Sequence, residues 1–300
     1  MTTPDPALPA PPPSLPRRVA GALHRHPRVR LGGLLAAPLG WLVIAYLGAL
    51  LLFLLTSIWS VDSFSGNLVT TPTLKNYVDV VTGDVYRTIA LRTLLMAAVV
   101  TLTTIVLAFP IAFYMAKLAS ARTRGILVVS ILLPLWSGYL VKVYAWRLIL
   151  NSTGVLNGVL APLGLHGPGF GIVAVWLVET YLWLPYMIIP IFSGLERVPG
   201  SLLEASADLG GRSFTTFRRV VLPLALPAVV AGSIFTFSLT LGDYITPALV
   251  SNERFIGTVI YDFLGVAGNQ PFAAAYAMVP VAIMIVYLLV ARRLGAFEAL

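Results

Sequence analysis

Cysteine is absent from the chain, and acidic and basic side chains are scarce. The absence of cysteine among the 300 residues excludes disulfide bonds and any metal site ligated by cysteine. Only 11% of the residues are charged, whereas soluble proteins contain about 25%. Hydrophobic residues make up 58% of the chain. A soluble protein of this length could not cover its surface with so few charges, so the sequence predicts a membrane protein.

The sequence also lacks the motifs of nucleotide-binding and metal-dependent enzymes. No G-x-x-x-x-G-K-[ST] segment occurs, and the loops between apolar segments are too short to hold a nucleotide-binding domain. The histidines His24, His26 and His166 do not have metal-ligand spacing. The net charge is +8, but the basic residues lie in short segments beside apolar ones, which argues against nucleic acid as a partner. We therefore expect no enzyme activity and no cofactor bound by this chain.

Six apolar segments are long enough to cross a membrane, because a spanning helix needs about 20 mostly apolar residues. The first is too long for the core of a signal peptide, so we expect it to be retained. The sequence therefore predicts an all-α polytopic membrane protein with six transmembrane helices. The predicted spans are residues 32–59, 88–116, 124–150, 171–194, 223–250 and 272–291.

Lysine and arginine lie mostly at one end of these spans, and such residues are enriched on the cytoplasmic side of membrane proteins. Only Lys75, Arg87 and Arg254 lie outside under this assignment. Both termini and the loop at 195–222 are therefore predicted to be cytoplasmic. The cytoplasmic basic residues are Arg17, Arg18, Arg25, Arg28, Arg30, Lys117, Arg122, Arg124, Arg197, Arg212, Arg218, Arg219, Arg292 and Arg293.

Two short tails flank the predicted membrane domain at 31–292. Residues 1–30 begin with a proline-rich segment that we expect to be disordered. They continue with a basic segment, which either only orients the chain or also contacts anionic lipid headgroups. Residues 293–300 form a second predicted cytoplasmic tail.

The loop at 195–222 has local signals for a helix, a turn and a second helix. Ser201 to Leu209 contains no glycine or proline and predicts a short helix, capped by Ser201 with Glu204 completing an S-x-x-E box. Gly210 and the following glycine are expected to end that helix. A second short helix is predicted from Ser213, before Pro223 opens the fifth span.

Residues 204–223 also carry a specific spacing: E-A-A, three residues, G, nine residues, I, one residue, L-P, with Ser206 for alanine and Val220 for isoleucine. This pattern resembles the cytoplasmic coupling loop of binding-protein-dependent ABC importer permeases. The resemblance implies that the loop docks into a cleft on a cytoplasmic ATPase. Glu204 would make charged contacts there, and Gly210 would permit the turn. The other implied coupling residues are Ala205, Ala207, Asp208, Leu209 and Arg212.

Segments 133–147, 184–190 and 242–247 resemble the spermidine/putrescine subfamily of these permeases. The resemblance implies a permease subunit in the bacterial cytoplasmic (inner) membrane, in contact with lipid. Its implied partners are a cytoplasmic ABC ATPase dimer that binds ATP and Mg²⁺, a second permease subunit and an external solute-binding protein. It favours a polyamine as the solute, and leaves another small organic solute or ferric iron open.

Charged residues within the spans are costly, which invites a functional interpretation of each. They are Lys142, Arg147, Glu179 and Asp243, with Arg92 at a similar depth. In a structural interpretation the basic side chains extend to the outer interface, and Lys142 pairs with Glu179. In a functional one, carboxylates and aromatic rings line a path for a cation. For Glu179 and Asp243 the sequence leaves both open; the path would comprise Glu179, Asp243, Tyr244, Trp183, Lys142 and Trp146.

Two other classes of protein compete with the importer hypothesis. An ion-coupled secondary transporter would use the intramembrane charges itself, but no inverted repeat of broken helices is evident. An intramembrane hydrolase would need a Ser/His or Asp/Asp pair within the spans, and no convincing pair occurs. Neither class explains the spacing at 204–223.

Overall fold

The computed structural model describes residues 27–62 and 64–294, and these are almost entirely helical. The chain divides into two units, residues 1–55 and 56–300, which we describe separately. Residues 1–26 of the predicted tail at 1–30 and residues 295–300 of the second tail lie outside the described residues, whereas residues 27–30 already belong to the first helix.

The first unit is one long apolar helix. It consists of α2 (Pro27–Trp41), a π-helical turn η1 (Leu42–Leu47) and α3 (Gly48–Thr56). The part from Leu31 to Thr56 contains 26 residues, enough to cross a bilayer at about 1.5 Å per residue. Its side chains are apolar around the whole circumference and almost all are exposed. This helix corresponds to the predicted first span.

The second unit begins with a small hairpin and a short helix. Strands β1 (Ser60–Val61) and β2 (Leu68–Val69) pair antiparallel, and α4 (Lys75–Thr82) follows. In the turn, the Asp62 carboxylate accepts hydrogen bonds from the backbone N–H groups of Ser65 (2.8 Å) and Phe64 (3.0 Å). These bonds hold the pKa of Asp62 below its usual value.

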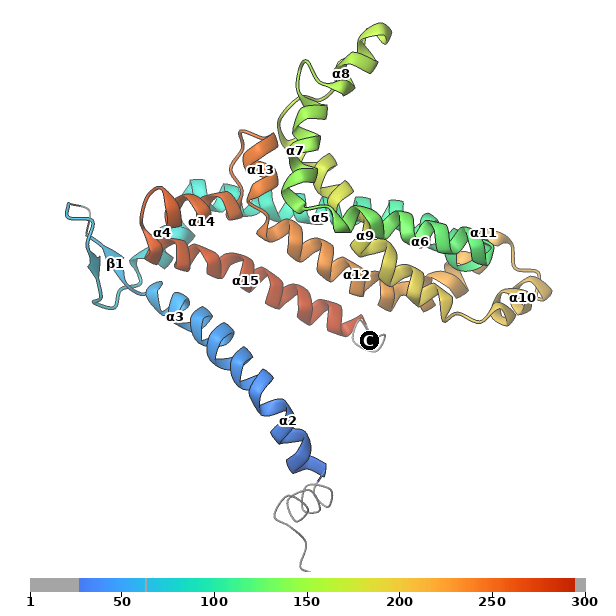
Figure 1. Ribbon diagram of the computed structural model, residues 1–300, viewed down its shortest axis with the longest axis horizontal. Helices are drawn as coiled ribbons and strands as arrows, with labels where there is room; N and C mark the ends of the chain where they lie inside the picture. The colour runs from blue at the N-terminus through green and yellow to red at the C-terminus, as the bar shows by residue number, and fades with distance from the viewer. Residues whose placement is uncertain (1–26, 63, 295–300) are drawn as a thin grey trace, which may run out of the picture. The chain divides into compact units, whose positions relative to one another are not determined.

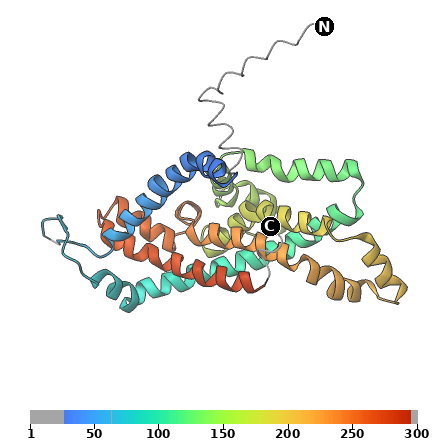
Figure 2. The same cartoon turned by 90° about the horizontal axis from the view of Figure 1, so that it is seen from below.

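Long helices form the body of the second unit (Figures 1 and 2). Helix α9 packs against both α5 and α12, and α5 also packs against α12. Close approach of α9 and α12 depends on small residues, because a Cβ atom on Gly194 would lie 2.3 Å from the Cβ of Ala228. The helices are α5 (Asp84–Phe113), continued by the π-helical η2 (Tyr114–Leu118), α9 (Ile172–Glu196), α12 (Leu222–Gly242) and α15 (Gln270–Arg293).

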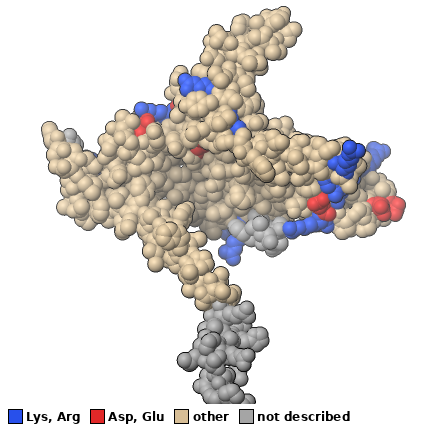
Figure 3. Space-filling view, in the orientation of Figure 1, with Lys and Arg blue, Asp and Glu red and all other residues tan. Residues whose placement is uncertain are grey.

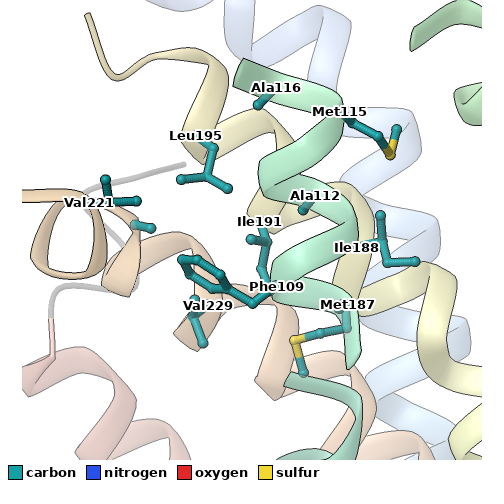
Figure 4. Close-up of a cluster of buried hydrophobic side chains, with 12 residues drawn as sticks. Phe109, Ala112, Met115, Ala116, Met187, Ile188, Ile191, Leu195, Val221 and Val229 are labelled. Atoms are coloured by element: carbon teal, nitrogen blue, oxygen red, sulfur yellow. The ribbon is translucent and has the colours of Figure 1, made fainter. Parts of the chain in front are cut away.

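One buried apolar cluster joins these helices near their α10 end (Figure 4). Phe109 of α5 and Ile191 of α9 are among its members, and Val221 brings in the start of α12. Phe109 makes an edge contact with Phe217, with ring centroids 5.3 Å apart. The cluster therefore anchors the segment before α12 to the core.

The predicted third span is not one helix. Helix α6 (Ala121–Trp136) is followed by α7 (Tyr139–Leu150), and the chain bends by 93° between them. Ser137 and Gly138 adopt extended backbone conformations, which interrupt the helical hydrogen bonds. Hydropathy could not reveal the bend, since both pieces are apolar. The short helix α8 (Val155–Leu160) and the 3₁₀ turn η3 (Ala161–Leu163) follow α7.

The predicted fifth span also has different ends. Helix is continuous from Ser213 to Gly242, and Asp243 then takes an extended conformation. Residues 245–250, predicted to complete the span, form the separate helix α13 (Ile245–Val250); α14 (Ile256–Gly265) follows. The described residues hold five helices long and apolar enough to span a membrane, or six if the bent α6–α7 pair counts as one. The predicted all-α polytopic class is confirmed.

Candidate coupling segment and buried polar cluster

The segment predicted to couple to an ATPase lies at one end of the second unit (Figure 1). It consists of α10 (Gly200–Asp208), a glycine turn, α11 (Ser213–Thr216) and the π-helical η4 (Phe217–Val221), which runs directly into α12. Gly210 has φ +75°, a left-handed conformation in which a Cβ atom would be strained. The glycine turn is where the sequence placed it, but the second helix is the start of the α12 helix rather than a separate one.

The capping box predicted at Ser201 is not formed. The residue before the helix is Pro199, which makes no side-chain cap, and the helix already begins at Gly200. Ser201 therefore lies inside the first turn, where its side chain does not occupy the capping position. The helix prediction itself differs from α10 by one residue at each end.

The predicted coupling residues form an open surface. Every one of them is exposed, and Leu209 is 89% exposed. Figure 3 shows lysine and arginine side chains gathered at this end of the unit, while the middle of the bundle on this face carries few charges. Leu203 and Phe217 point the other way and pack on the buried cluster. The residues that are exposed here are Glu204, Ala205, Ala207, Asp208, Leu209, Gly210 and Arg212.

A hydrogen bond holds α10 against α11. The hydroxyls of Ser206 and Thr216 are 2.8 Å apart, so the serine that replaces an alanine of the expected pattern has a partner. Gly211 fits tightly beside them: a Cβ atom there would lie 2.6 Å from the carbonyl oxygen of Ser206. The two helices therefore form a compact helix–turn–helix with little freedom at the turn.

The second candidate site is a buried polar cluster at the break between α12 and α13. Asp243 is 9% exposed and accepts three hydrogen bonds. Its donors are the Tyr139 hydroxyl (2.5 Å) and the backbone N–H groups of Ile245 (2.9 Å) and Thr246 (3.2 Å). Tyr139 also bonds the Thr246 hydroxyl at 2.8 Å. Asp243 thus holds the start of α13 and fastens it to α7, which is the structural role.

Glu179 has a different environment. It lies on α9, is 1% exposed, and its Oε2 atom has no hydrogen-bond partner among the described residues. Glu179 interacts electrostatically with Asp243 and Tyr139. One turn along α9, the Trp183 ring stacks on Tyr139 with centroids 5.9 Å apart. In the part of the chain that the structure describes, the Trp183 Nε1 and the hydroxyls of Thr180 on α9 and Thr240 on α12 also lack partners.

The other residues predicted to line the path are Lys142, Trp146 and Tyr244, and their described contacts are with residues other than Glu179 and Asp243. The predicted Lys142–Glu179 pair is wrong: among the described residues Lys142 forms no ion pair. Trp146 contacts Tyr181 instead, and Tyr244 forms an exposed stack with Tyr261 at 4.9 Å. Arg92, predicted to extend to the outer interface, pairs with Glu253 and donates to the Arg254 carbonyl oxygen, tying α5 to the loop before α14.

Sequence reasoning missed Tyr139 and Thr246 as partners of Asp243. Tyr139 directly follows the Ser137–Gly138 break, and that break was the available signal. The tyrosine faces Asp243 only because the chain turns there, which apolar content does not reveal.

Comparison with known proteins identifies the class. Residues 90–296 match the family described as "Binding-protein-dependent transport system inner membrane component", and the chain belongs to that family. It is therefore a permease subunit of an ABC importer in the inner membrane, and it does not hydrolyse ATP itself. This assignment replaces the secondary-transporter and hydrolase hypotheses.

The relatives include two kinds of permease. The chain is 43% identical over 299 residues to the inner membrane ABC transporter permease protein YdcU of Escherichia coli K12, covering 94% of this chain and 95% of the relative. It is 30% identical to the spermidine/putrescine transport system permease protein PotB of Haemophilus influenzae, covering 79% and 84%.

Solved structures share the fold at low identity. A bacterial alginate ABC transporter, solved in complex with an alginate pentasaccharide-bound periplasmic protein, matches with a TM-score of 0.72 at 15% identity, covering 94% of this chain and 98% of that one. The MetNI methionine ABC transporter in an inward-facing conformation matches with a TM-score of 0.55 at 17% identity, covering 72% and 96%.

Proposed function

We propose that this permease carries a polyamine, such as spermidine or putrescine, delivered by an external solute-binding protein. It would work with a second permease subunit and a cytoplasmic ABC ATPase dimer that binds ATP and Mg²⁺. The α10 segment would face the cytoplasm, as would both termini. The PotB relatives support a polyamine by name; the observation that carries the proposal is the buried Glu179 side chain, whose Oε2 atom has no hydrogen-bond partner among the described residues.

Coupling to the ATPase rests on the surface of α10. Glu204 and Asp208 are exposed acids on a helix that is fixed to the core through Leu203. Leu209 and Phe214 add exposed apolar area beside them. One face of this helix exposes charged and apolar side chains, and the opposite face packs on the core. Such a helix is suited to binding in a cleft of another protein.

Selection of an amine rests on the difference between the two buried acids. Asp243 already has three donors, so it has little capacity for a solute. Glu179 has an acceptor oxygen, Oε2, without a partner among the described residues, and the Trp183 ring, one turn further along α9, stacks on Tyr139. Burying an unpaired charge is strongly unfavourable, so an ionised carboxylate here needs a cation. An ammonium group can donate hydrogen bonds to the carboxylate and make cation–π contacts with the rings.

The test is ATP-driven uptake by the complete transporter in proteoliposomes. Glu179→Gln keeps the size of the side chain and removes its charge, and we expect spermidine uptake to fall about tenfold, since one charge-assisted hydrogen bond contributes about 1.5–3 kcal/mol. Asp84→Asn is the control, because Asp84 is an exposed acid at the start of α5. Unchanged uptake by Glu179→Gln would contradict a role for this carboxylate.

The solute itself is tested by competition. Unlabelled spermidine or putrescine should block uptake, whereas phosphonates, neutral amino acids and ferric iron should not. If one of these competes and polyamines do not, the importer assignment stands and the polyamine proposal fails. The test matters because the 43% identical relative carries no solute in its name.

A further inference from the structure

A short joint connects the last transmembrane turn of α9 to the coupling helix α10. It consists of residues 197–199. The structure holds each side of this joint by a basic residue from elsewhere in the chain. On the α9 side, Arg124 Nη1 pairs with Glu196 Oε1 at 3.1 Å. On the α10 side, Lys117 Nζ donates to the Val198 carbonyl oxygen at 2.6 Å.

Arg124 also connects two further elements. It lies in the first turn of α6, and its Nε donates to the Met115 carbonyl oxygen at 3.1 Å and its Nη2 to that of Ala116 at 3.5 Å. Those carbonyls belong to η2, the last turn of the α5 helix, where helical acceptors run out of partners. One guanidinium group thus joins the start of α6, the end of α5 and the end of α9.

The joint connects α10 to α5 and α6, against which α10 itself packs little. Helix α10 packs mainly on α11 and η4, so movement of α10 reaches α12 directly along the continuous helix from Ser213. Toward α5 and α6, the polar contacts near the joint include the Lys117 and Arg124 bonds, beside the buried side chain of Val198. Beside the apolar packing of Leu203 on the buried cluster, these polar bonds tie the joint directly to α5 and α6.

We propose that Lys117 and Arg124 are positioning residues that transmit movement of α10 to α5 and α6 during transport. The proposal rests on the proposed docking of α10 to the ATPase. Arginine suits position 124 because its planar guanidinium group can donate to several acceptors at fixed angles, which lysine cannot do. Lysine suits position 117, where one carbonyl oxygen is the acceptor.

The test compares ATP hydrolysis with uptake in the complete transporter, reconstituted in proteoliposomes. The double variant Lys117→Met with Arg124→Gln should bind the ATPase and hydrolyse ATP at close to the normal rate. Solute uptake per ATP should fall about tenfold, within the 5–150-fold range of typical coupling between sites. Arg122→Gln is the matched control, since Arg122 is an exposed neighbour in the same turn.

Two further variants separate positioning from folding. Lys117→Arg keeps a donor for the Val198 carbonyl oxygen, so it should retain most of the normal uptake per ATP. Arg124→Lys should retain little of it. The chain contains no cysteine, so Arg124→Cys with Glu196→Cys can be joined by a bismaleimide linker. Cross-linking should raise uptake per ATP above that of the same cysteine pair before cross-linking.

Three results would overturn the proposal. They are normal uptake per ATP in Lys117→Met with Arg124→Gln, a parallel loss of hydrolysis and uptake in that variant, and no gain in uptake per ATP when the cysteine pair is cross-linked. A different variant tests the underlying proposal that α10 docks to the ATPase. If that proposal is wrong, Glu204→Lys should leave ATPase binding intact, whatever the Lys117 and Arg124 variants do.

Discussion

The coupling segment and the buried polar cluster are built in opposite ways. The predicted coupling segment, 200–221, is continuous in sequence, and the side chains predicted to contact the ATPase are exposed. The polar cluster brings Tyr139, Glu179 and Asp243 together from distant parts of the chain, and buries the two acids. An exposed segment can change its surface at little cost in stability, whereas a buried cluster ties function to folding.

Both regions depend on an interrupted helix. At Gly210 the interruption is a left-handed glycine that lets α10 fold back toward α11. At Asp243 it is an extended residue whose own carboxylate caps the next helix. The first needs only a residue without a Cβ atom, while the second needs a partner from α7. Substitutions at these positions should therefore separate local from tertiary effects.

The largest effect on stability is expected for Asp243→Ala. It leaves the Tyr139 hydroxyl and two backbone N–H groups without their acceptor, and should lower the free energy of unfolding by about 3 kcal/mol. Asp243→Asn retains one acceptor oxygen for the backbone and should cost about 1 kcal/mol. Thermal unfolding in detergent measures both; equal stability of Asp243→Ala and the parent chain would contradict the capping role.

A smaller effect is expected for Gly210→Ala. A Cβ atom in the left-handed conformation costs about 1–2 kcal/mol, and the strain should loosen α10 rather than unfold the bundle. Hydrogen exchange of the α10 amides should rise while that of α9 stays the same. Gly200→Ala is the control, because a Cβ atom there meets nothing within 4 Å; a similar change in both variants would count against the argument.

The hydrogen bond between Ser206 and Thr216 should contribute about 1 kcal/mol or less, since both side chains are partly exposed. Ser206→Ala and Thr216→Val should each loosen α10 slightly, as seen by hydrogen exchange. The double variant should be no worse than either single variant, because each removes the same bond. Fully additive losses would show that the two hydroxyls act independently.

The smallest effect on stability is expected for Glu204→Ala, within about 0.5 kcal/mol, because the side chain is exposed. Co-purification of the ATPase should nevertheless fall sharply. This pair of results would set the coupling segment apart from Asp243, where function and stability change together. A stability loss comparable to that of Asp243→Ala would erase the contrast.

The membrane class, the approximate spans and the turn at Gly210 could all be predicted from the amino-acid sequence. These follow from apolar length and from residues close together in the chain, such as the glycine pair after α10. The sequence could not decide where the third and fifth spans break. Ser137–Gly138 and Asp243 interrupt segments whose apolar content is continuous, and hydropathy does not register a change in backbone direction.

The contacts of the buried charged side chains follow from the packing of distant helices. From the sequence, Glu179 and Asp243 were equal candidates, and Lys142 was a plausible partner of Glu179. The bends after α6 and α12 instead bring Tyr139 and Thr246 to Asp243 and leave Glu179 with an unused oxygen. A side chain's role inside a membrane depends on which groups from distant helices satisfy it, and that is settled by packing rather than by position in the chain.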